Sequence, residues 1–307
     1  MSGNLVQRAC PVCGTSTGHP FLHKQTLDLV RCADCGMVYA NPVEEGLSTG
    51  LFYDHLAVPF YLSPDKLQSD YSPVRFVREL KLFRSFFRRG SVLDVGCSTG
   101  AFLYQLKKKF PGDYDVTGID VAGPALDHAE KMGVSVMRES FLNTNFGTRR
   151  FDAITFWAVI EHLDKPAEFL ARAASLLNRG GVCFILVPNL KSLAVRLLGA
   201  KYRYIFPQHL NYFTATTLKR FAAQAPGLRI LQSCSTHFNP IVIWQDWRGS
   251  GQFVPDASRA ALLKRTTAYK RHPLLKPLKW GLGAAEAFLG QMNLADNIVM
   301  VLQKDDL

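Results

Sequence analysis

The sequence predicts an α/β fold of the nucleotide-binding type, preceded by a small cysteine-rich module. The stretch 91–103 contains an apolar strand, a turn between Gly96 and Gly100 and an amphipathic helix, in that order. Apolar strands and helices then alternate to about residue 235, and two Cys-x2-Cys motifs lie near the N-terminus. Strand, glycine turn and helix typically open an α/β unit that binds its ligand at the helix N-terminus.

Composition and charge narrow the class of protein. The chain has 307 residues, of which 48% are apolar and 20% charged, as in ordinary globular enzymes. It contains no uninterrupted apolar run of about 18 residues and no apolar stretch at its start that resembles a secretory signal, so we expect a cytoplasmic protein. The net charge of +11 is compatible with nucleic acid, an anionic membrane or an acidic small substrate.

Residues 1–42 predict a zinc ribbon. The motifs place Cys10, Cys13, Cys32 and Cys35 at the spacing C-x2-C-x18-C-x2-C, and the residues between them predict a hairpin. About forty residues bury too little apolar surface to fold alone, so a metal is needed. A site closed by four cysteines is structural rather than catalytic. Residues 43–74 follow as an aromatic connector and candidate lid, and 75–307 as the catalytic domain.

The turn at 96–100 discriminates between ligands. A dinucleotide fingerprint requires glycine where this chain has Ser98 and Ala101. Asp94, at the end of the strand, would repel a pyrophosphate and attract a cation. Asp120 ends the next strand, where a carboxylate can bind a ribose diol. Together these residues favour an adenosyl ligand that carries a positive sulfonium and no phosphate.

The segment Asp94-Val-Gly-Cys-Ser-Thr-Gly100 resembles the first motif of class I S-adenosylmethionine-dependent methyltransferases. Segments 151–157, 161–163, 180–181 and 188–189 resemble the later motifs of that family in the same order. The resemblance implies a Rossmann-like seven-stranded sheet with helices on both faces and S-adenosylmethionine as cofactor. It also implies a set of cofactor-binding residues: Asp94, Gly96, Cys97, Gly100, Asp120, Val121, Ser140, Phe141 and Trp157.

The remaining elements follow from apolar periodicity and helix-end signals. Asp164 and Thr214 are predicted helix caps, and Gly180–Gly181 are predicted to end one helix before the next strand. The expected helices are 75–89, 101–109, 124–132, 166–177, 216–224, 257–269 and 280–289. The expected strands are 115–119, 134–137, 151–157, 182–187 and an antiparallel last strand, 297–303.

Three polar residues are the catalytic candidates. Glu161 and His162 follow the fourth strand, and His209 lies in an acceptor-side insertion at about 190–213. His162 or His209 is the candidate base, and Glu161 is expected to orient its neighbour or a cofactor group. Some RNA-end methyltransferases bind a divalent metal with Glu-x-x-Glu-His. Ala158 replaces the first of those glutamates here, which disfavours a catalytic metal.

The favoured function is methyl transfer to oxygen or carbon of a small molecule, such as a sugar, a lipid-linked compound or a secondary metabolite. An RNA methyltransferase that uses the ribbon and basic helices to hold RNA is one alternative. A non-catalytic cofactor-binding protein is the other. Basic and apolar residues in the helical segment at about 238–292 also suggest contact with an anionic membrane surface. The sequence leaves the oligomeric state open.

Overall fold

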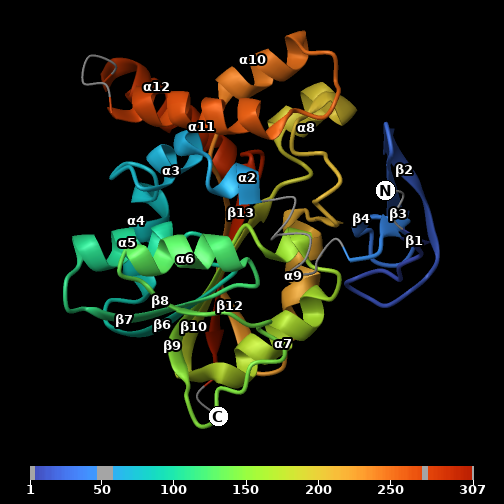
Figure 1. The fold of residues 1–307 in the computed structure, drawn as a ribbon. Helices are drawn as coiled ribbons and strands as arrows, with labels where there is room; N and C mark the ends of the chain where they lie inside the picture. The colour runs from blue at the N-terminus through green and yellow to red at the C-terminus, as the bar shows by residue number, and fades with distance from the viewer. Residues whose placement is uncertain (1–3, 47–57, 272–275, 306–307) are drawn as a thin grey trace.

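A seven-stranded mixed sheet forms the centre of the computed structural model, which describes residues 4–46, 58–271 and 276–305 (Figure 1). Five neighbouring strands are parallel, and β13 is antiparallel to both of its neighbours, as predicted. In spatial order the strands are β12 (Leu228–Thr236), β13 (Asn297–Lys304), β10 (Leu177–Pro188), β9 (Phe151–Trp157), β6 (Gly90–Val95), β7 (Tyr114–Ile119) and β8 (Ser135–Met137).

Helices cover both faces of this sheet (Figure 1). Successive side chains of a strand point to opposite faces, so Val92 of β6 packs in one apolar cluster and Leu93 in the other. The first cluster contains side chains of α4 (Val77–Phe86), α5 (Ala101–Lys109) and α6 (Gly123–Lys131). The second contains side chains of α7 (Pro166–Leu176) and α9 (Ala215–Ala222).

Most predicted boundaries are confirmed within a few residues, and two are wrong. Gly180–Gly181 do not precede the fifth strand but lie inside β10, where the pairing with β9 shifts register between Leu177 and Val182. Asp164 does not cap α7, whose N-cap is Lys165 and has no side-chain cap. Thr214 does cap α9: its hydroxyl accepts from the amide of Thr217, in a reciprocal capping box.

The N-terminal segment forms its own four-stranded sheet, which also receives a strand from the catalytic domain. The predicted hairpin is β2 (Gly18–Lys24) and β3 (Leu27–Cys32). β4 (Val38–Ala40) pairs with β3 on one side and with β11 (Asn211–Tyr212) on the other. A small separate sheet joins β1 (Leu5–Val6) to β5 (Val43–Glu44). The ribbon is thus joined to the catalytic domain by backbone pairing.

A group of helices lies beyond the carboxyl ends of the parallel strands (Figure 1). Part of the predicted connector forms two of them, and α11 packs on both; residues 47–57 of the connector lie outside the described residues. Across the described ranges, no helix has the length and apolar character needed to cross a membrane. The helices of this group are α2 (Val58–Tyr61), α3 (Pro64–Asp70), α8 (Leu193–Leu198), η3 (Gly199–Lys201), α10 (Pro240–Arg248), α11 (Asp256–Arg271) and α12 (Lys276–Gln291).

Candidate active site

The predicted cofactor turn lies between β6 and α5, next to the point where the strand order reverses. Gly96 and Gly100 both have φ +71°, in the left-handed region that favours glycine. A Cβ on Gly96 would also come within 2.6 Å of Cγ2 of Val159. Position 96 therefore requires glycine for two reasons: its φ is positive, and Val159 in the loop after β9 leaves no space for a side chain. Ser98 adopts φ +49°, so the serine itself takes up the left-handed conformation that the turn requires.

Asp120 forms hydrogen bonds both to the turn after β6 and to the loop after β7. Its Oδ2 accepts a hydrogen bond from the amide of Ser98 at 2.7 Å. Its Oδ1 accepts from the amides of Val121 at 2.7 Å and Ala122 at 3.0 Å. The carboxylate thus orders both loops at the carboxyl ends of β6 and β7, in addition to the ribose contact expected from sequence.

Asp94 is a buried carboxyl group beside the same turn. Only 3% of its surface is exposed, and the hydroxyl of Thr155 donates a hydrogen bond of 2.6 Å to its Oδ1. Burial raises the pKa of Asp94 to about 7; the hydrogen bond from Thr155 opposes that shift and the charge of Asp120 adds to it. Two carboxyl groups beside a glycine turn fit a cationic adenosyl ligand and disfavour a pyrophosphate.

The other predicted cofactor residues are more scattered. Cys97 is buried in the turn, and burial raises the pKa of its thiol well above the ordinary value. Ser140 begins the turn after β8, where its carbonyl accepts from the hydroxyl of Thr144. Phe141 is 3% exposed and packs in the sheet core. Trp157 packs against Phe102 of α5, with ring centroids 5.1 Å apart. Cofactor contacts by these residues, and by those of the glycine turn and the Asp120 loop, stay predictions.

The catalytic candidates, in contrast, lie together. Glu161 and His162 belong to the short helix η2 (Ile160–His162), which follows β9, and His209 precedes β11. One ligand atom from each of the three lies within 4.8 Å of the others, and the two imidazole centroids are 4.7 Å apart. Glu161 is 1% exposed, and neither of its carboxyl oxygens has a hydrogen-bond partner within the part of the chain that the structure describes.

Burial also sets the protonation of this cluster. It raises the pKa of Glu161 to about 8. It lowers the pKa of His162 to about 4; a hydrogen bond to the carbonyl of Gln208 opposes this shift and the charge of Arg259 adds to it. It lowers the pKa of His209 well below the ordinary value, with further contributions from His162 and Arg259. Both imidazoles are consequently neutral near pH 7.

Asn211 is a site residue that the sequence analysis did not single out. Its side-chain amide donates to the carbonyls of Ile160 at 3.0 Å and Leu163 at 2.6 Å. The amide of Leu210 donates to the carbonyl of Glu161 at 2.8 Å. These bonds hold the two chain segments of the cluster together. Asn211 was visible in the sequence only as part of an aromatic stretch.

Tyr61 and Arg259 extend the site from distant parts of the chain. Burial raises the pKa of the Tyr61 hydroxyl, and the charges of Asp120 and Glu161 raise it further, so Tyr61 of α2 lies near both the cofactor residues and the catalytic candidates. The guanidinium of Arg259, on α11, lies 4.7 Å from the ring centroid of Phe60 and 4.5 Å from that of Phe206. The sequence marked these residues only as part of an aromatic connector and a basic tail.

The four cysteines also lie together. The Sγ atoms of Cys10 and Cys35 are 3.4 Å apart, as are those of Cys13 and Cys32, and all four lie within 4.8 Å of one another. Sulfurs at about 2.3 Å from a tetrahedral zinc would lie about 3.8 Å apart, so the cluster fits that metal. The guanidinium of Arg220, an exposed residue in the last turn of α9, donates a hydrogen bond to the carbonyl of Cys35 and anchors this end of the ribbon.

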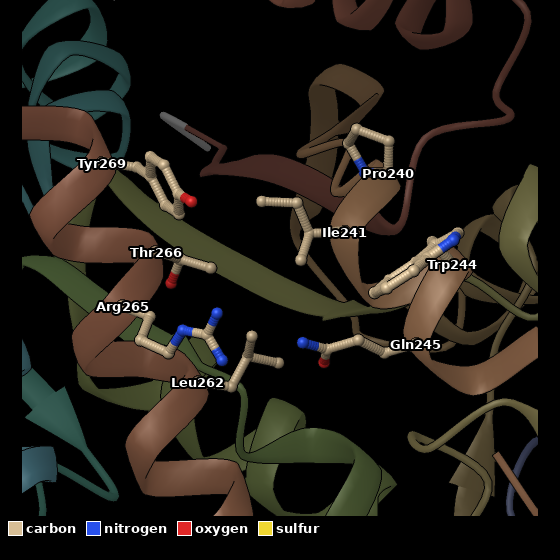
Figure 2. Close-up of a pocket in the computed structure, with 8 residues that line it drawn as sticks. All are labelled: Pro240, Ile241, Trp244, Gln245, Leu262, Arg265, Thr266 and Tyr269. Atoms are coloured by element: carbon tan, nitrogen blue, oxygen red, sulfur yellow. The ribbon is translucent and has the colours of Figure 1, made fainter. Parts of the chain in front are cut away.

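A separate cavity of about 350 Å³ lies between α10 and α11. Figure 2 shows Trp244 and Ile241 of α10 facing Leu262, Arg265 and Tyr269 of α11 across it. None of the predicted catalytic, cofactor or metal residues lines this cavity. It is therefore distinct from the cluster around Glu161.

Comparison with known proteins agrees with this geometry. A family model described as a methyltransferase domain matches residues 68–233. Relatives include the ubiquinone biosynthesis O-methyltransferase of Coxiella burnetii, 27% identical over 163 residues (49% of this chain, 68% of that protein). The enzyme of the same name from Burkholderia pseudomallei is 29% identical over 164 residues (49% and 69%).

Solved structures share the fold. A SAM-dependent methyltransferase from Thermotoga maritima has a TM-score of 0.52 and 15% identity, over 84% of this chain and 99% of that one. The plantazolicin methyltransferase BamL, solved with SAH, has a TM-score of 0.50 and 16% identity, over 84% and 98%. Because the family model spans more than half of the chain, the chain belongs to the methyltransferase-domain family and is an S-adenosylmethionine-dependent methyltransferase.

Proposed function

We propose that this enzyme transfers the methyl group of S-adenosylmethionine to oxygen or acidic carbon of a small molecule. The observation that carries the proposal is the cluster of Glu161, His162 and His209, which lies at the same carboxyl end of the parallel strands as Asp94 and Asp120. S-adenosylmethionine supplies a methyl group already activated by its sulfonium. The protein has to align the acceptor, exclude water and help the acceptor lose its proton.

The relatives favour oxygen as the methylated atom. The two ubiquinone biosynthesis enzymes are named O-methyltransferases. A hydroxyl acceptor is a weak nucleophile until it loses its proton, and it therefore needs polar groups beside it. We place that hydroxyl between the cluster and the cofactor turn, near Arg259, whose guanidinium packs on Phe206 beside His209.

Kinetics of two variants test the assignment. We expect His162→Ala to lose more turnover than His209→Ala, because His162 directly follows the strand end that delivers catalytic groups. His209→Ala should mainly raise the Michaelis constant of the acceptor. Both variants should still bind S-adenosylhomocysteine. Near-normal turnover of His162→Ala with the true acceptor would argue against a role of His162 in proton removal.

We also propose that Cys10, Cys13, Cys32 and Cys35 bind one structural zinc ion. The support is the spacing of the motifs and the proximity of the four sulfurs. Elemental analysis of freshly purified protein should find about one tightly bound zinc per chain. Cys32→Ser should disturb the N-terminal segment more than it weakens cofactor binding. Protein that folds fully without metal would contradict the proposal.

The RNA alternative is less favoured because basic residues of the helix before the core motif have acidic partners. Arg84 pairs with Asp113 at 2.6 Å, and Arg78 pairs with Glu286 of α12. Phosphate contacts would have to compete with these pairs. We retain an anionic membrane surface, or an acceptor linked to a lipid, as a proposed partner. Its support is the exposed Trp247 of α10 and Trp280 of α12.

We further propose the division of the chain expected from the sequence: ribbon (1–42), aromatic connector (43–74) and catalytic domain (75–307). Within the catalytic domain, the insertion at about 190–213 contributes His209 and β11, and the helical segment at about 238–292 contributes Arg259. Both segments reach the acceptor side, which is consistent with roles in acceptor recognition. We place the enzyme in the cytoplasm.

A further inference from the structure

Glu161, His162 and His209 have the composition of a metal site with open positions. We propose that these three residues bind one divalent transition-metal ion. Two imidazoles and one carboxylate on one side of an ion are typical of iron, manganese and zinc centres whose remaining positions accept water or substrate. The binding itself follows from the geometry below. Its role in catalysis rests on the function proposed above.

The two imidazoles have the tautomer that a metal ligand needs. Nδ1 of His162 lies 2.8 Å from the carbonyl oxygen of Gln208, and Nδ1 of His209 lies 3.0 Å from that of Tyr204. A carbonyl oxygen only accepts hydrogen bonds, so each Nδ1 carries a proton and donates it. In a neutral imidazole this leaves the lone pair on Nε2. Metal-bound histidines are commonly fixed by such a bond from the other ring nitrogen.

Glu161 supplies a second, independent observation. Its side chain is almost fully buried, and among the described residues neither of its oxygens has a hydrogen-bond partner. Nε2 of the neighbouring His162 is 3.9 Å from Oε1, too far for a hydrogen bond. Buried polar groups are normally paired, and a buried carboxyl group without a partner is costly in either protonation state. A cation between Glu161 and the two Nε2 atoms would satisfy all three groups at once.

The backbone holds these ligands in place. The amide of Leu210, next to His209, donates to the carbonyl of Glu161. Asn211 donates to the carbonyls of the first residue of η2 and of the residue that follows η2. The ligand atoms span up to 4.8 Å, whereas ligands at about 2.0–2.2 Å from one ion lie about 3–3.5 Å apart. Closing that difference requires only small side-chain rotations on a fixed backbone. The Glu-x-x-Glu-His motif of RNA-end enzymes has a glutamate at the position of Ala158, so that ligand is missing here. His209 instead provides the third ligand, beside Glu161 and His162.

The neighbourhood of the cluster indicates what would occupy the open positions. The guanidinium of Arg259 lies 4.5 Å from the ring centroid of Phe206, and that ring lies 4.3 Å from the imidazole of His209, centroid to centroid. A positive charge this close to the cluster opposes a bare cation. An anionic oxygen between the ion and the guanidinium would remove that conflict. A hydroxyl acceptor fits, because a metal ion lowers the pKa of a bound hydroxyl and stabilises its oxyanion. The substrate class is thus a hydroxyl compound that binds the ion as an oxyanion before methylation.

Mn²⁺ is the appropriate probe because four thiolates select zinc, whereas imidazole and carboxylate accept manganese. The full-length, zinc-loaded protein is titrated with Mn²⁺ and the free ion is followed by electron paramagnetic resonance. We expect one Mn²⁺ per chain. Glu161→Gln and His209→Gln should each weaken its binding by at least about tenfold. His23→Gln is the matched control, since that exposed histidine also lies beside a carboxylate, Asp28.

S-adenosylhomocysteine calorimetry on the same samples separates the two proposals. Variants that bind this ligand normally but lose Mn²⁺ support the metal site. If wild-type protein binds S-adenosylhomocysteine but neither Mn²⁺, Co²⁺ nor a second Zn²⁺, the metal site is wrong while the methyl-transfer proposal stands. Equal Mn²⁺ affinity in wild type and both ligand variants would also overturn it. Metal binding without methylation of any hydroxyl compound would instead contradict the proposed function.

Discussion

Binding of S-adenosylmethionine should displace a proton from Asp94. Burial raises the pKa of this carboxyl to about 7, so it is about half protonated at pH 7 before the cofactor binds. The positive charges of S-adenosylmethionine favour the ionised carboxylate. The cofactor therefore binds the deprotonated protein more tightly, and its affinity should rise with pH through about 7.

The size of the effect follows from that pKa. At pH 6 about nine molecules in ten carry the proton, and at pH 8 about one in ten does. If the bound cofactor keeps the carboxylate ionised, affinity should be about tenfold lower at pH 6 than at pH 8, which corresponds to about 1.4 kcal/mol. At pH 7 about half a proton should be released per cofactor bound.

Calorimetry in buffers of different ionisation enthalpy measures both quantities. Asp94→Asn is the matched control, because the amide keeps the shape and can still accept from Thr155. It should bind more weakly at pH 8 and lose the part of the pH dependence that is due to Asp94. The amino group of the cofactor also titrates, but its contribution to the pH dependence of binding is the same for wild type and Asp94→Asn. An identical pH slope in wild type and Asp94→Asn would refute the reasoning.

Three further predictions concern other parts of the molecule. Asp120→Ala should weaken S-adenosylhomocysteine binding by about 1.5–3 kcal/mol in calorimetry, because charge-assisted hydrogen bonds that order both loops are lost; unchanged affinity would contradict its role. Asp246→Ala should lower the free energy of unfolding in urea by about 3–5 kcal/mol, since it leaves Arg203 buried without its partner; the exposed Asp115→Ala should cost less than about 1 kcal/mol. Wild-type protein should sediment with anionic vesicles at low salt and Trp247→Ala less so; no sedimentation at all would exclude the membrane surface.

The strands of the sheet could be predicted because each buried strand is recognisable from a short run of apolar residues. The run Phe151–Trp157 is almost entirely apolar, as both faces of a parallel strand are covered, and it forms β9 with those boundaries. The glycine turn and the acids around it were predictable for a similar reason. Their roles depend on a few residues close together in sequence, which the strand–turn–helix order brings to one edge of the sheet.

The errors and omissions arise where distant segments meet. Gly180–Gly181 suggest a helix end, but pairing with β9 extends the strand through them with a shift in register. The fourth strand of the ribbon sheet comes from residues 211–212, far from the cysteines in sequence. Arg259 looked like one of many basic residues of the tail. Only its position between Phe60 and Phe206 identifies it as part of the site.

These long-range contacts also explain how the proposed zinc ribbon can influence the chemistry. Arg8, at the start of the ribbon, donates to the carbonyl of Leu210 at 3.2 Å and to that of Asp164 at 3.0 Å. β4 pairs with β11 immediately after His209. The segments that carry Glu161 and His209 are thus held from outside by the ribbon sheet, and under the zinc proposal the stability of this sheet depends on the four cysteines. Loss of the ribbon would leave the glycine turn and Asp120 in place but release one side of the catalytic cluster, so its effect should fall on the acceptor rather than on the cofactor.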